Sequence, residues 1–137
     1  MQSVETDDIL FKVLSSNKEL KAALSGGIYT LGERPDDSEK EDIVINCLAL
    51  THEVPQSGTS NVNIHVPDQV LRIGGKQQRK ANRERIRTLT ELVLKTLKAA
   101  NVEGLSFWVD SEHVIKEEPA KEHYNNLRVE WNIQLTN

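Results

Sequence analysis

The spacing of apolar residues changes along the chain from a helical rhythm to a strand rhythm and back, and it predicts the order of the elements. Near the N-terminus, apolar side chains recur every three or four residues, so residues 6–14 are predicted to form a helix that Thr6 caps, with acids in its first turn. A second short helix follows, capped by Asn17 or Ser16. Glycines 26 and 27 are expected to end it, because glycine adopts the left-handed conformation of a helix cap at low cost.

A longer amphipathic helix is predicted for residues 77–100. Its apolar stripe consists of Ile86, Leu89, Val93, Leu97 and Ala100. The stretch before it, residues 67–75, is expected to be an irregular crossing.

Strands are predicted where apolar and polar residues alternate. The expected strands are 28–33, 42–54, 61–66, 105–109 and 127–135. In the third, Val62, Ile64 and Val66 are expected to face the core and Asn61, Asn63 and His65 the solvent. The last has the clearest alternation, with an inward set of Leu127, Val129, Trp131, Ile133 and Leu135. Residues 55–60 are expected to form a turn, and residues 116–126 the loop of a hairpin.

The predicted order, α-(α)-β-β-β-α-β-β, indicates an α+β fold, with a mainly antiparallel sheet and helices packed on one face. The 137 residues, 37% of them hydrophobic and 28% charged, suit a single globular domain spanning residues 1–137. No apolar run reaches the roughly 20 residues that a membrane span needs, and the first residues lack the pattern of a secretory signal. Cys47 is the sole cysteine, which is typical of a reducing compartment.

The stretch "GIYTLGER", residues 27–34, has the two spaced glycines of a phosphate-binding loop. Such a loop requires Lys followed by Ser or Thr directly after the second glycine, since the lysine neutralises phosphate charge and the hydroxyl binds magnesium. Glu33 and Arg34 stand there instead, and an acid would repel phosphate. We therefore expect this stretch only to end a helix and begin a strand, and we expect no cofactor.

The other chemical candidates are also weak. His113, Glu117, Glu118 and His123 lie close in sequence, but without the helical H-E-x-x-H spacing, so no metal site is expected. Cys47 lies within an apolar strand, where a thiol is usually inert, and no Gly-x-Ser-x-Gly elbow is present. No catalytic residues are therefore predicted. The two tryptophans, Trp108 and Trp131, are expected in the core rather than on a base-stacking platform.

The distribution of charge is more informative than the net charge of −4. A basic run crowds the start of the predicted long helix, where cations oppose the helix dipole: Arg72, Lys76, Arg79, Lys80, Arg83, Arg85 and Arg87. An acidic loop, residues 33–42, contains six acids and two bases. These regions could pair within a subunit, pair head to tail between subunits, or simply be solvated. The predicted interface residues are Arg79, Lys80, Arg83, Arg85, Asp36, Asp37 and Glu39.

Several stretches together resemble the tail-completion proteins of long-tailed phages, a family that includes tail terminators and head–tail joining proteins. The resemblance spans residues 9–135 and lies in "GGIYTLGERP", "DIVINCLAL", "NVNIHV", a long helix and "NLRVEWNIQL". It implies a structural protein that is not an enzyme. Such proteins form a ring, commonly of six subunits, on the tail tube; the ring stops tube polymerisation and presents a surface to the head connector.

The resemblance also implies a phage or prophage origin, synthesis in a bacterial cytoplasm and a place in the virion tail. The segment of residues 74–85 is longer and more basic than expected for this family, which leaves the partner of that segment open. The alternative is a small nucleic-acid-binding domain that uses the basic patch at residues 72–87. The net charge and the absence of a recognised binding motif speak against it, and direct DNA contact stays open.

Overall fold

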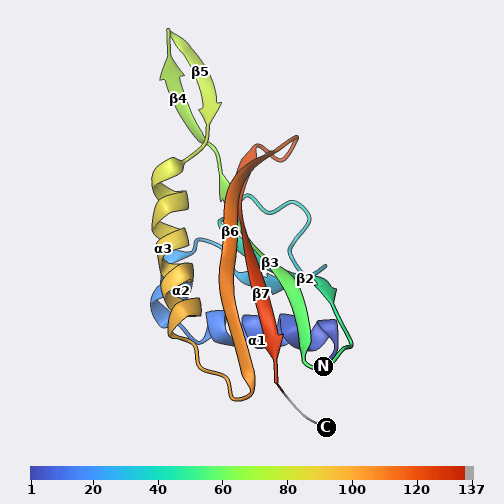
Figure 1. Cartoon of the computed structure of the whole chain (residues 1–137). Helices are drawn as coiled ribbons and strands as arrows, with labels where there is room; N and C mark the ends of the chain where they lie inside the picture. The colour runs from blue at the N-terminus through green and yellow to red at the C-terminus, as the bar shows by residue number, and fades with distance from the viewer. Residues whose placement is uncertain (135–137) are drawn as a thin grey trace.

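The computed structural model describes residues 1–134, and Figure 1 shows helices packed behind a twisted sheet. The helices are α1 (Ser3–Ser15), α2 (Lys18–Ala23) and α3 (Arg83–Ala99). The strands are β1 (Ile28–Thr30), β2 (Asp42–Leu50), β3 (Gln56–Pro67), β4 (Gln69–Ile73), β5 (Lys76–Lys80), β6 (Leu105–Glu117) and β7 (Glu122–Ile133).

The main sheet has the strand order β1-β2-β3-β7-β6. The β1 and β2 strands run parallel, and the other neighbours run antiparallel. The β4 and β5 strands form a separate two-stranded hairpin. The α+β class and the predicted order of elements are confirmed, with this hairpin as an addition.

The core lies between the sheet and the two longer helices. The predicted inward residues of β3 and β7 are buried, and so are Ile86, Leu89, Val93 and Leu97 of the helical stripe. Each such side chain contributes about 1.5–3 kcal/mol when fully buried. Trp131 is 2% exposed and its indole Nε1 donates a hydrogen bond to Ser60 Oγ at 2.9 Å. The core prediction is confirmed, except that Ala100 caps the end of α3 and is only half-buried, and that Leu135 lies outside the described residues.

Trp108 does not belong to this core. Its side chain is 50% exposed, and it pairs in register with Glu130 on the sheet face away from the helices. Its neighbours Phe107 and Val109 take the inward positions instead. The prediction that both tryptophans are buried is therefore wrong for Trp108, because strand alternation places it on the opposite face from Phe107.

The first helix begins three residues earlier than Thr6. Glu5 accepts a hydrogen bond from the Gln2 backbone N–H at 3.3 Å, while Thr6 lies buried within the helix and donates to the Ser3 carbonyl at 2.6 Å. Thr6 is therefore not the cap. The second cap prediction is confirmed, since Asn17 accepts a hydrogen bond from Leu20 N–H at 3.1 Å.

Gly26 is needed for a different reason from the one predicted. Leu24 caps α2 in an extended conformation, so no left-handed glycine ends this helix. A Cβ on Gly26 would instead lie 2.6 Å from the Glu41 carbonyl oxygen, so the chain can pass here only without a side chain. The following residues enter β1 at Ile28, as predicted.

The segment before α3 differs most from expectation. Residues 67–80 were predicted as an irregular crossing and the start of a helix, but Pro67 ends β3 and residues 69–80 form the β4–β5 hairpin. Gly74 and Gly75 both have positive φ, 59° and 79°, which makes the two-residue turn that joins the strands. The helix begins only at Arg83, where Asn82 accepts a hydrogen bond from the Arg85 N–H at 3.3 Å.

Two further strands are longer than predicted. β3 starts at Gln56, so the expected turn at residues 55–60 is largely strand. β6 and β7 pair almost to their connection, which leaves residues 118–121 as the loop in place of the predicted 116–126. The polar residues at this end predicted a long loop, but the paired strands extend past the apolar core and remain strands there.

Candidate functional site

The acidic loop, residues 33–42, spans most of the connection between β1 and β2 and includes the first residue of β2, and Arg34 holds it to the sheet. Arg34 donates through Nε to Asp42 Oδ2 at 2.9 Å, and through Nη1 and Nη2 to the two carboxylate oxygens of Glu122, each at 2.9 Å. The acceptor side chains are only 1% and 3% exposed. A two-pronged arginine–carboxylate pair fixes direction as well as distance, so the loop is held to β2 and β7.

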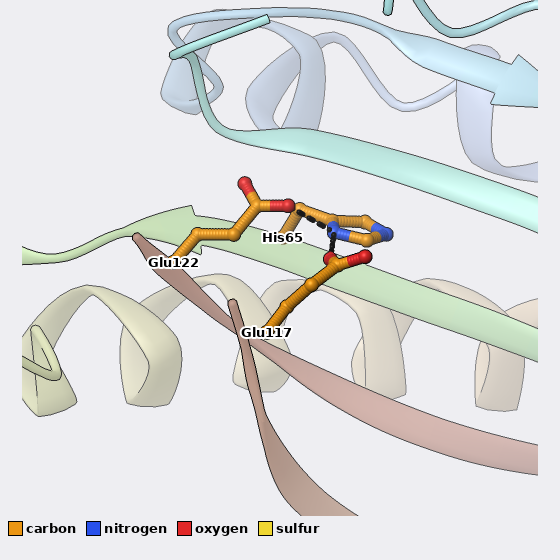
Figure 2. Close-up of side chains that lie close together, drawn as sticks. All are labelled: His65, Glu117 and Glu122. Atoms are coloured by element: carbon orange, nitrogen blue, oxygen red, sulfur yellow. Dashed lines mark hydrogen bonds and ion pairs between the residues drawn. The ribbon is translucent and has the colours of Figure 1, made fainter. Parts of the chain in front are cut away.

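His65 and Glu117 complete this buried ion network. The Nδ1 atom of His65 lies 3.0 Å from Glu122 Oε1 and 3.6 Å from Glu117 Oε2. Figure 2 shows both glutamates pointing toward this atom. Its ring stacks on Tyr124 with centroids 5.0 Å apart. His65 was predicted to face solvent, but it is buried, because Arg34 reaches over this end of the sheet.

The network separates the acidities of its two glutamates. Burial would raise the pKa of Glu122, but hydrogen bonds from His65 and Arg34 lower it to about 2. Burial, together with the neighbouring Glu122 carboxylate, raises the pKa of Glu117. For Arg34, burial opposes the charge, but its hydrogen bonds to Glu122 and Asp42 raise its pKa overall. Glu122 therefore stays charged as the partner of Arg34.

The same side chains include a possible set of metal ligands. One ligand atom each from His65, Glu117 and Glu122 lie within 4.8 Å of one another. However, Arg34 Nη1 is 3.1 Å from His65 Nδ1 and binds Glu122 directly. A metal ion would have to enter beside a guanidinium, which already neutralises the carboxylate. The arrangement fits a structural ion network better than a cation site.

The sequence cluster considered for metal is dispersed in the structure. Glu117 alone joins the buried network. His123 pairs with Asp68 at 2.6 Å, and Glu118 forms an exposed ion pair with Lys116 at 2.7 Å. His113 lies exposed on β6.

The outward side of the acidic loop carries three of the predicted interface residues. Asp36, Asp37 and Glu39 are exposed, and they line a hollow together with Arg79 of β5. Within residues 1–134, no ion pair joins Arg79 to these acids. The structure thus brings the acidic loop and one predicted base together in a single chain, with their charges free for another partner.

Arg85 is engaged inside the chain. It donates to both Glu41 carboxylate oxygens, at 2.6 and 2.8 Å, and to the Ala23 carbonyl at 2.7 Å. The hydrogen bond from Arg85 lowers the pKa of Glu41 despite its partial burial. Arg85 therefore ties α3 to the end of the acidic loop and to α2. Of the other predicted bases, Arg83 is exposed on α3, and Lys80 is exposed at the end of β5.

Four of the seven predicted bases, Arg72, Lys76, Arg79 and Lys80, lie on the hairpin, so the prediction that they crowd a helix N-terminus is wrong for them. It is confirmed for Arg83, Arg85 and Arg87, which lie in the first turns of α3. We call residues 69–80 the basic arm. It contains Arg72, Lys76, Arg79 and Lys80 and no acid. Figure 1 shows it projecting beyond the body, and its strands pack chiefly against each other. The adjacent glycines 74 and 75 are the signal in the sequence that could have revealed the hairpin, because a Gly-Gly pair is typical of a two-residue hairpin turn.

The basic arm also exposes apolar surface. Val70, Leu71 and Ile73 are 51%, 38% and 43% exposed. The register Leu71↔Gln78 and Ile73↔Lys76 places the last two of these apolar side chains on one face, while Val70 lies with Arg79 on the other. An isolated two-stranded hairpin is at best marginally stable in water, so binding to a partner would stabilise this arm.

Comparisons with known proteins add little. No family model matches the chain. No curated protein matches it either. Among solved structures, a chain of the virion of a native gene transfer agent particle is similar with a TM-score of 0.49 and 11% identity, over 90% of each chain. A similarity of this size does not establish a shared function. None of the helices in residues 1–134 has the length and apolar character needed to cross a membrane.

Proposed function

We propose that the chain is a structural subunit of a phage or prophage tail. In this proposal, copies assemble into a ring, with six subunits expected, that ends polymerisation of the tail tube and helps to join the tail to the head connector. The subunit is made in the bacterial cytoplasm, resides in the virion tail and has no catalytic role.

One observation carries the proposal: a projecting basic arm stands beside a rigidly held acidic loop on the same chain. The buried ion network costs desolvation and yields no evident catalytic arrangement, but it fixes the loop in place. Surfaces of opposite sign on one chain suit a head-to-tail contact, and such a contact closes into a ring when the rotation permits. The resemblance of the sequence to tail-completion proteins supports the same reading.

The proposal predicts that opposite charges support assembly: bases on the arm and at the start of α3, and acids on the acidic loop. Reversing Arg79, Lys80 and Arg83 to glutamate should weaken self-association, measured by sedimentation velocity, without lowering the melting temperature. Reversing Asp36, Asp37 and Glu39 to lysine in the same chain should restore part of it. Single exposed pairs contribute roughly 0–1 kcal/mol, so the combined change is needed.

A matched control carries the same change of charge elsewhere. Lys12, Lys18 and Lys21 are exposed on α1 and α2, and their reversal to glutamate should leave association unchanged. If this control weakens association equally, net charge alone explains the effect. If the combined loop and arm variant associates no better than the arm variant, the two regions do not complement each other.

The tail role has its own test. Deleting the gene from the phage or prophage that encodes it should produce tails of abnormal length that are not joined to heads, seen by electron microscopy. Tails of normal length joined to heads would contradict the proposal.

A second candidate, nucleic-acid binding, is favoured by the shape of the arm. A two-stranded ribbon with four exposed bases and no acid can enter the major groove of DNA. Binding of this kind should weaken steeply with salt. Tight, salt-dependent binding of duplex DNA by a monomer would favour this function over the ring.

A further inference from the structure

Within residues 1–134, the strands of the basic arm pack chiefly against each other. Val70, Leu71 and Ile73 stay exposed, although burying such side chains is the main source of stability for a hairpin of this size. Phosphate binding would use the bases but leave these apolar side chains in water. The combination of apolar and basic residues therefore favours a protein surface that offers apolar contacts and acids.

The rest of this chain has the required charge. The whole chain has a net charge of −4, and the arm holds four bases and no acid, so the other residues together carry −8. A second copy of the chain is thus an acidic partner for the arm.

The β6 strand provides a place on that second copy. It is 13 residues long and lies at the edge of the main sheet, hydrogen-bonded to β7 on one side. The opposite edge of the sheet is the three-residue β1. Long edge strands are templates for pairing with another chain, and proteins usually shorten or block them. β6 is therefore the longer of the two edges of the main sheet.

The surface beside this edge offers apolar contacts to the arm. A groove between β6 and α3 contains the half-exposed Val114, the apolar Leu94 and two acids, Glu91 and Glu112. Arg83 and Arg87 also line it, within the first turns of α3. The apolar face of the arm carries Leu71 and Ile73 with Lys76 and Lys80 alongside. Its apolar side chains can meet Val114 and Leu94, while the lysines can approach Glu91 and Glu112, whose charge Arg83 and Arg87 balance within the groove.

We infer that the arm of one copy docks along the β6 edge of a second copy, with Leu71 and Ile73 against Val114 and Leu94. The two surfaces are different parts of the chain, so the contact is heterologous and can propagate around a ring. This inference rests on the assembly proposed above and adds a second contact to it. The face of the arm with Leu71 and Ile73 meets the β6 edge, whereas Arg79 lies on the opposite face with Val70 and is left for the acidic loop.

Cysteine cross-linking tests the contact directly. In a Cys47→Ser background, a chain with Ile73→Cys is mixed with a tagged chain with Val114→Cys under mild oxidation. The expected result is a disulfide-linked heterodimer that forms about tenfold faster than with Val54→Cys, because docking raises the effective concentration of the two thiols. Val54 is 93% exposed and lies outside the proposed contact, so it is a suitable control. Equal rates for the two pairs would overturn the inference.

A shortened arm separates this inference from the proposed function. Gln69 and Lys80 face each other in register, so a Gly-Gly turn can replace residues 70–79 between them. If the wild type assembles and the shortened chain, folded by circular dichroism, stays monomeric, the inference is supported. If both assemble alike, the inference is wrong and the ring proposal stands. If the wild type is monomeric at every concentration, both are wrong. Loss of duplex DNA binding on shortening, without any arm-dependent cross-link, would assign the arm to DNA and overturn the inference.

Discussion

Removing the guanidinium of Arg34 should destabilise the protein far more than its surface position suggests. Arg34→Met keeps much of the side-chain volume but leaves the carboxylates of Asp42 and Glu122 without their shared cation. Asp42 retains hydrogen bonds from the Gly27 N–H and the Ser38 hydroxyl, whereas Glu122 retains only His65 and Glu117 nearby. Breaking one side of a buried ion pair costs about 3–5 kcal/mol, and we expect a loss in that range at pH 7.

The pH dependence of this loss gives a second readout. The folded-state pKa of Glu122 is lowered to about 2, so its stabilising contribution is present above its unfolded pKa near 4.5 and is lost as the pH falls toward 2. The difference in unfolding free energy between wild type and Arg34→Met should therefore shrink as the pH falls from 5 to 2, because the Glu122 carboxylate becomes protonated and no longer needs a cation.

Urea denaturation at a series of pH values measures both effects. The matched control is Arg79→Met, which removes the same group from an exposed position on the arm and should change stability by less than about 0.5 kcal/mol. A loss below about 1 kcal/mol for Arg34→Met at pH 7, or a loss that grows on acidification, would refute the view that this arginine holds the loop through buried charges.

The remaining predictions concern the core and the acid response. Trp131→Ala should cost about 3–5 kcal/mol in denaturant melts, whereas Trp108→Ala, at a half-exposed position, should cost less than about 1 kcal/mol; similar losses would contradict the assigned faces of the strands. Glu122→Gln should flatten the fall in stability between pH 4.5 and pH 2, because it removes a carboxylate whose pKa is lowered by folding; an unchanged slope would assign that acid response to other groups.

The parts of the fold that could be predicted are those where burial imposes a period. Val129 and Trp131 alternate with polar residues because one face of β7 meets the core, and Leu89 and Val93 recur at helical spacing for the same reason. The basic arm gave no such signal, because both of its faces meet solvent and nothing requires Lys76 to Lys80 to alternate. Glutamine, lysine and arginine are good helix formers, so propensity favoured the wrong element there.

The ion pair that holds the acidic loop could not be predicted from the sequence for a different reason. Arg34 and Glu122 are 88 positions apart in the sequence, and each lies among other charges that look solvated. Their pairing depends on how β7 and the acidic loop meet in three dimensions, and a short stretch of sequence contains no information about that. The acidic loop itself could be identified from its charge. The role of its exposed acids as interface residues stays a prediction.

The mass of the protein in solution tests the central claim, that the chain is a ring-forming subunit, most directly. Light scattering coupled to size exclusion, across a concentration series at low salt, should give a discrete particle whose mass is a whole multiple of 15.5 kDa, with six copies as the expected number. Raising the salt should shift it toward the single chain, since opposite charges contribute to the contact. A particle of 15.5 kDa at every concentration would contradict the account.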